Sequence, residues 1–120
     1  MRILAVEWLR SLPLAADLPE GNICLSILEP GTELHAHCGP TNVRLRAHLG
    51  LRVPERCGLS VGEEVLSWRE GEWLVFDDSF EHLAWNRSDR PRVILIVDLW
   101  HPQIDTAELR RAALRGLPAR

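Results

Sequence analysis

Histidines and arginines in the middle of this chain are of the types that could form a metal site beside an anion-binding site. His37 and His82 each lie next to strand-like sequence, and imidazole nitrogens bind Fe, Zn, Ni or Cu. Between them, Arg44, Arg46 and His48 recur at every second position. Guanidinium groups bind carboxylates bidentately. The pattern predicts a metal centre with an anion-binding pocket inside a small β-barrel.

The segment 42–51 alternates strictly between polar and apolar residues, as a half-buried strand does. Arg44, Arg46 and His48 share one face of it. That face, which also includes Asn42, could simply lie in water, but surface strands usually mix charge signs and the ionisable side chains of this face are all basic. If the face points inward, burying these groups without an anionic partner is costly. In that case the ligand of the pocket is an anion.

Arg92 begins the most apolar segment of the chain, which runs to Trp100. Two interpretations stay open for it. The side chain could lie at the end of a sheet and reach solvent. Alternatively, its guanidinium could close one end of a pocket and hold the far carboxylate of a dicarboxylic acid.

Acidic and aromatic residues near these positions have simpler interpretations. Asp77, Asp78 and Glu81 precede His82 and are expected to be turn residues and solvated charge. Orienting the imidazole, or completing a metal site, is the alternative. The tryptophans are interpreted as core and rim packing.

Short strands separated by turns are predicted over most of the chain, which is typical of a sandwich or barrel. We expect them at 23–28, 32–37, 42–51, 59–61, 64–68, 73–76, 82–86 and 92–99. Gly58, Gly62 and Gly71 are expected at turns. One helix is predicted at 106–114, with Thr106 as its N-cap. Residues 1–21 are expected to form a short helix or strand followed by a loop.

Composition narrows the class of protein. A chain of 120 residues is bounded to one domain, and 46% apolar with 26% charged residues is ordinary for a soluble globular protein. The net charge of -3 argues against nucleic-acid binding. Three cysteines without CxxC spacing indicate a reducing compartment. With no signal peptide or membrane-spanning run, we expect a cytoplasmic protein.

Two segments resemble the paired motifs of cupins. Residues 71–86 have the order glycine, strand, turn, His82 and Asn86, and Pro30-Gly31 leads into His35-x-His37. Together they favour a double-stranded β-helix, with one histidine on an early strand and another on a later one.

Four segments together closely resemble the aspartyl/asparaginyl β-hydroxylase family of 2-oxoglutarate-dependent non-haem iron oxygenases. They are residues 26–32, 37–51, 76–82 and 96–102. The resemblance implies an all-β fold, a double-stranded β-helix (a jelly-roll, cupin-like barrel) with a short C-terminal helix. We expect a single compact domain over 1–120, with an N-terminal lead-in at 1–22, the β-helix core at 23–102 and a helical tail at 103–120.

The resemblance also implies a metal set. His37 and His82 match the two iron-binding histidines of the family. Gly39 stands where most 2-oxoglutarate oxygenases carry a carboxylate ligand. The resemblance also implies that His35 is not a third metal ligand.

Further positions match residues that bind the cosubstrate and the substrate. Ser26 and Arg92 match those that hold the distal carboxylate of 2-oxoglutarate, and Arg46 and His48 match those near its other end. Arg44, together with Arg46, matches the residues that take the carboxylate of the substrate side chain. His37, His82 and Arg92 would thus be the catalytic set.

The implied activity is hydroxylation that depends on Fe(II), 2-oxoglutarate and O₂. Its target would be an aspartyl- or asparaginyl-type β-carbon in a peptide or small molecule bearing a carboxylate or carboxamide. Family catalytic domains usually carry a longer segment before the strand at Ser26, so the substrate itself stays open. We expect no nucleic-acid and no membrane partner. A homodimer that covers an open barrel end is compatible with this length.

Three alternatives remain from the sequence. A 2-oxoglutarate-dependent halogenase would use the missing carboxylate position for chloride. A non-catalytic cupin-like module would hold Zn or Ni through His35, His37 and His82 and sense a small anion. A truncated homologue would only bind 2-oxoglutarate.

Overall fold

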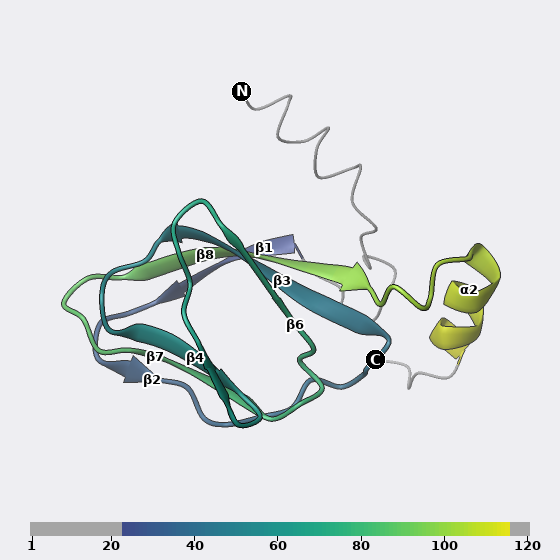
Figure 1. The fold of residues 1–120 in the computed structure, drawn as a ribbon, viewed down its shortest axis with the longest axis horizontal. Coiled ribbons are helices and arrows are strands. Elements are labelled where there is room, and N and C mark those ends of the chain that lie inside the picture. The colour runs from purple at the N-terminus through teal and green to yellow at the C-terminus, as the bar shows by residue number, and fades with distance from the viewer. Residues whose placement is uncertain (1–22, 116–120) are drawn as a thin grey trace.

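The computed structural model describes residues 23–115, which form two four-stranded antiparallel sheets and one helix (Figure 1). The first sheet has the order β1 (Ile23–Leu28), β8 (Arg92–Trp100), β3 (Arg44–Arg52) and β6 (Trp73–Phe76). The second has the order β2 (Thr32–Glu33), β7 (His82–Asn86), β4 (Cys57–Val61) and β5 (Glu64–Leu66). The helix is α2 (Ala107–Arg115). The predicted all-β fold with a C-terminal helix is confirmed, and the expectation for residues 1–21 lies outside the described part.

The strand that carries the basic residues lies in the middle of the first sheet. β3 pairs with both β6 and β8, so it has no free edge. Its alternation places Arg44 and His48 inside, where they are only 1% and 6% exposed. The inward orientation predicted from the sequence is confirmed, and the solvent-exposed alternative is wrong.

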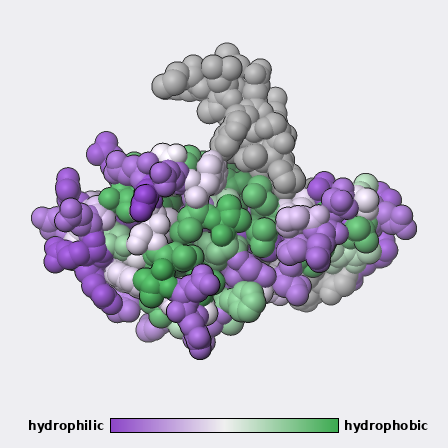
Figure 2. Space-filling model, in the orientation of Figure 1, coloured by the Kyte–Doolittle hydropathy of each residue, from purple (hydrophilic) through white to green (hydrophobic). Residues whose placement is uncertain are grey.

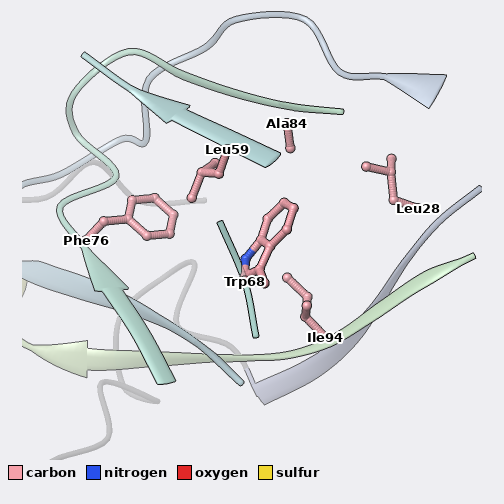
Figure 3. Packing of buried hydrophobic residues seen from close by; sticks show 6 residues of the cluster. All are labelled: Leu28, Leu59, Trp68, Phe76, Ala84 and Ile94. Atoms are coloured by element: carbon pink, nitrogen blue, oxygen red, sulfur yellow. The ribbon is translucent and has the colours of Figure 1, made fainter. Parts of the chain in front are cut away.

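The space between the two sheets holds the hydrophobic core. Its buried members come from both sheets and from the loop after β5 (Figure 3): Leu28, Leu59, Trp68, Phe76, Ala84 and Ile94. Apolar burial of this kind is the main favourable term in folding. It also supplies a rigid wall for the polar side chains beside it.

Two local predictions differ from the structure. The segment 32–37 pairs with β7 as a ladder only at Thr32 and Glu33, and it returns to that strand at a single bridge through His37. Gly58 is not in a turn but within β4, where the ring of Trp85 occupies the place of a side chain. Gly62 and Gly71 do lie at turns, with φ of 58° and 79°, a region that favours glycine.

The helix begins as predicted, because Thr106 Oγ1 accepts a hydrogen bond from the Leu109 amide at 3.1 Å. The segment before α2 and the helix itself contact Trp100 at the end of β8 through Ile104, Ala113 and Leu114. Among residues 23–115, no helix has the length and apolar character needed to cross a membrane.

The outer face of β1 is apolar. Figure 2 shows hydrophobic residues gathered in the middle of the face that it presents, with hydrophilic residues towards both ends. Ile23, Leu25 and Ile27 alternate along β1 and are exposed apolar side chains. The polar site described below lies on the opposite side of this sheet, towards the interior.

Candidate metal and anion site

A histidine pair is the centre of the site. His37 and His82 are cross-strand partners, because each amide donates to the other's carbonyl, at 3.0 Å and 2.9 Å. Side chains of such a pair leave the same face of the ladder. The two imidazole centroids are accordingly only 4.3 Å apart.

Hydrogen bonds to the backbone fix the tautomer of both rings. His37 Nδ1 donates to the His35 carbonyl at 2.9 Å, and His82 Nδ1 donates to the Phe80 carbonyl at 2.8 Å. A neutral imidazole then has its lone pair on Nε2, the form that binds a metal. The donor set therefore fits a divalent transition metal such as Fe(II).

His35 contributes only its backbone carbonyl to this site. Its carbonyl holds the ring of His37, while its own side chain is exposed. Within the described residues, no three His, Cys, Asp or Glu side chains group as a metal site. The three-histidine arrangement of a cupin-like module is thus not the one the structure brings together.

Gly39 has no room for a side chain. A Cβ there would collide with the carboxylate of Asp78, and the Gly39 amide already donates to the Asp78 carbonyl at 2.6 Å. Asp78 cannot move aside cheaply, because Arg44 Nη2 donates to it at 2.9 Å. A carboxylate ligand at position 39 is therefore excluded by packing.

We expect Gly39→Asp to destabilise the fold rather than complete a three-ligand site. The new carboxylate would be forced against Asp78, combining a steric clash with like-charge repulsion. Thermal unfolding should show a lower melting temperature, and metal affinity should not rise. Asn42→Asp places the same carboxylate at an exposed position nearby and is the control. Tighter metal binding by a stable Gly39→Asp protein would contradict this reading.

A cavity of about 90 Å³ runs inward from the histidine pair. Its polar lining comes from both sheets and comprises Ser26, His37, Arg46, His48, His82 and Arg92, with Trp68 and Phe76 among the apolar wall. His37 is exposed whereas His82 is 6% exposed. The size limits a buried ligand to a small molecule, and the exposed side of the cavity is the His37 side.

His48 presents a neutral N–H to this cavity. The Trp68 indole Nε1 donates to His48 Nδ1 at 3.0 Å, so the ring proton is on Nε2. Nε2 is buried and has no hydrogen-bond partner among the described residues. Burial, and then the charges of Arg92 and Arg46, lower the pKa of His48 to about 3. The group is a donor that lacks an acceptor.

The stability of the protein should fall in acid partly because of His48. Its pKa of about 3 in the folded state lies below the ordinary 6.5, so the unfolded chain binds more protons between these values. Stability is therefore lost as the pH falls from about 6.5 to about 3. His48→Gln should flatten this part of a melting-temperature profile, whereas exposed His35→Gln should not. An unchanged slope in His48→Gln would disprove the assignment.

Arg92 is a buried cation without a carboxylate partner among the described residues. It is 2% exposed, and its Nη2 donates to Ser26 Oγ at 2.8 Å. Its Cζ lies 4.5 Å from the Trp68 ring centroid, a cation–π contact. Burial lowers the pKa of Arg92 to about 10, so the charge persists at neutral pH. Of the two interpretations of Arg92, the solvent-reaching one is wrong, because the side chain is buried beside the cavity.

Arg44 and Arg46, by contrast, are balanced by two buried aspartates. Asp98 accepts from Arg46 Nε at 2.9 Å and from Arg44 Nη1 at 3.3 Å, and Asp78 accepts from Arg44 Nη2. Burial alone would lower the pKa of Arg46, but its hydrogen bond and attraction to Asp98 raise it. Arg46 lines the cavity and Arg44 does not. The predicted substrate role of Arg44 is therefore not visible in the cavity itself.

Asp78 and Asp98 are buried partners of the arginines. The prediction that Asp78 is solvated is wrong, because it is 1% exposed and paired with Arg44. Both Asp77 and Asp78 lie in the turn after β6, as predicted, and Asp77 accepts from the Ser79 amide at 2.9 Å. Asp98 lies within an apolar strand, and its even spacing from Arg92 is the sequence signal that places both on the inward face.

The family model and the similar proteins point to the same family. The family model of Aspartyl/Asparaginyl beta-hydroxylase matches residues 5–102. The chain is 53% identical over 91 residues to Aspartate beta-hydroxylase domain-containing protein 2 of Homo sapiens, covering 73% of this chain and 25% of that protein. It is 46% identical over 105 residues to the human Aspartyl/asparaginyl beta-hydroxylase, covering 87% of this chain and 14% of that protein. The chain thus spans a quarter or less of these relatives.

Solved structures share the fold at low sequence identity. A Cupin_2 domain of an XRE family transcriptional regulator from Enterobacter cloacae has a TM-score of 0.58 at 14% identity, over 76% of this chain and 92% of that one. The Schizosaccharomyces pombe Cnp3 cupin domain has a TM-score of 0.57 at 13% identity, over 79% and 61%. These similarities establish a cupin-type double-stranded β-helix and nothing about activity.

Proposed function

The chain belongs to the aspartyl/asparaginyl β-hydroxylase family, and we propose that it is an Fe(II)- and 2-oxoglutarate-dependent dioxygenase that hydroxylates an aspartyl- or asparaginyl-type β-carbon. The proposed cosubstrates are 2-oxoglutarate and O₂. The proposed target is a small molecule or peptide that bears a carboxylate or carboxamide.

The observation that carries this proposal is the unbalanced charge at the inner end of the cavity. Arg92 is a buried guanidinium without a carboxylate partner among residues 23–115, and His48 Nε2–H is a buried donor without an acceptor. Unpaired buried cations and donors are costly, so such groups mark a binding site for a complementary ligand. A dicarboxylate would pair with both.

Residues at the inner end of the cavity would bind the cosubstrate, and the histidine pair at the open end would bind the metal. Ser26 and Arg92 would hold the distal carboxylate, and His48 with Arg46 would orient the other end. His37 and His82 would bind the metal through Nε2 at the open end. Fe(II) with 2-oxoglutarate and O₂ supplies the oxidising chemistry, which yields CO₂, succinate and the hydroxylated substrate.

The wall of the cavity would keep water from the reacting groups. Phe76 lies against both rings, with centroids 4.9 Å from His48 and 5.6 Å from His82. Apolar neighbours of this kind lower the local dielectric and strengthen the charge contacts of a bound anion. The substrate would then enter from the side of exposed His37.

Anaerobic titration of the apoprotein with Fe(II) and then 2-oxoglutarate tests this proposal. We expect the visible charge-transfer band of a 2-oxoglutarate–Fe(II) chelate, and its loss in His82→Ala. His35→Ala is the matched control, since its ring is outside the pair and its backbone carbonyl is retained. Absence of the band in the wild-type protein, with Zn or Ni bound tightly instead, would favour the cupin-like binding module. Chloride-dependent product formation would separate the halogenase.

A further inference from the structure

Trp68 joins the two groups assigned to opposite ends of the proposed cosubstrate. Its indole N–H donates to His48 Nδ1 at 3.0 Å, and the face of the same ring lies 4.5 Å from Arg92 Cζ. In Figure 3 the indole nitrogen is on the side of the ring nearer Phe76, away from Leu28. One buried side chain, 4% exposed, therefore contacts both.

The contact with His48 determines which nitrogen of that ring can donate. An indole N–H is a donor only, so the nitrogen it meets must carry a lone pair. The single proton of the neutral ring is then on Nε2, the atom buried against the cavity. With the other tautomer, a lone pair would face an incoming carboxylate and repel it.

We propose that Trp68 is a positioning residue of this site, which fixes His48 as the Nε2–H tautomer and holds Arg92 in place, so that both point their donors at one dicarboxylate. The inference rests on the proposed function for the identity of the dicarboxylate, 2-oxoglutarate. The tautomer of His48 is a property of the protein alone and does not depend on the proposed function. It departs from the interpretation of Trp68 as packing only.

Trp68→Phe tests the role of the N–H. Phenylalanine keeps an aromatic face for Arg92, and it removes the donor to His48 together with the second ring of the indole. Trp100→Phe is the matched control, because Trp100 is also 4% exposed and also has an arginine, Arg110, over its ring at 5.5 Å. It lies in the other hydrophobic cluster, beside α2.

The first measurement is the tautomer of His48 in the apoprotein, by long-range proton–nitrogen correlation spectra of labelled protein, with His48→Gln for assignment. We expect the Nε2–H form in the wild type and in Trp100→Phe. Trp68→Phe should populate the Nδ1–H form. A wild-type ring protonated on Nδ1, or a ring unchanged in Trp68→Phe, overturns the proposal. If Trp68→Phe does not fold, the wild-type spectrum still tests the proposal, because a ring protonated on Nδ1 overturns it.

The second measurement is the affinity for 2-oxoglutarate of the anaerobic Fe(II) protein. We expect Trp68→Phe to weaken it about ten-fold, the worth of one hydrogen bond, and Trp100→Phe to leave it within about two-fold. In a His48→Gln background, whose amide donor has no tautomer, Trp68→Phe should change the affinity by less than about two-fold. An equal loss in both backgrounds would show a merely structural role and overturn the proposal.

The two measurements separate this inference from the proposed function. If the wild-type protein binds no 2-oxoglutarate, the proposed function fails. The His48 tautomer in Trp68→Phe still decides whether Trp68 acts on that ring. If 2-oxoglutarate binds and the tautomer does not respond to Trp68→Phe, only the present inference fails.

Discussion

Replacing Arg92 by alanine is expected to weaken 2-oxoglutarate binding by about 100-fold or more. The variant removes the only positive charge at the inner end of the cavity that has no carboxylate partner among the described residues. Loss of one partner of a buried, hydrogen-bonded charge pair costs about 2–5 kcal/mol, and each 1.4 kcal/mol is a ten-fold change in affinity. Titration calorimetry of the anaerobic Fe(II) protein measures the effect.

Removing the charge of Arg92 should weaken binding but raise the stability of the apoprotein. A buried guanidinium that lacks a carboxylate partner carries an unrecovered desolvation cost. Arg92→Met, which fills a similar volume, should therefore raise the melting temperature of the apoprotein while it abolishes binding. Arg92→Lys keeps the charge but loses the forked geometry and should be intermediate in affinity. Wild-type affinity in Arg92→Met would remove Arg92 from the binding site.

Replacing Arg44 by alanine is expected to destabilise the protein by about 3–5 kcal/mol. Arg44 is 1% exposed and pairs with Asp78 and Asp98, so its loss takes the close cation from buried Asp78 and one of the two arginines from Asp98. The penalty arises from these remaining charges rather than from the lost contacts alone. Denaturant unfolding, followed by fluorescence, measures the change in the free energy of unfolding.

Two control variants test the cause of the expected destabilisation in Arg44→Ala. Arg90→Ala removes an exposed arginine that is 4.0 Å from Asp89, and it should change the stability by less than about 0.5 kcal/mol. Adding Asp78→Ala to Arg44→Ala should recover part of the loss, because one uncompensated carboxylate is removed. A fully stable Arg44→Ala protein would show that the aspartates find other partners. Arg44→Lys is the milder variant with which to test the predicted substrate role.

Alternation along single strands made much of this site predictable. Arg44, Arg46 and His48 share a face because the side-chain period of a strand is two, and that face is inside in the structure. Arg92 begins an apolar strand and is buried, as one of the two interpretations held. These inferences needed only local sequence.

What the sequence did not predict depends on contacts between distant segments. Asp98 reaches Arg46 because β3 and β8 pair in a register that places the two opposite each other. Asp78 reaches Arg44 from the turn between β6 and β7. Trp68 has the residue type of core packing, and only its position beside His48 reveals a polar role. No periodicity along one strand encodes such pairings.

The pairing of His37 with His82 has a consequence for how fast a bound metal could leave. Both proposed ligands belong to one isolated bridge whose two amide hydrogen bonds join their own backbones. Either ring can turn away only if its Nδ1 bond to a carbonyl two residues earlier also breaks. We therefore expect metal exchange to be governed by local opening of this bridge. A change that slows amide hydrogen exchange at these two residues should then also slow the loss of metal to a chelator.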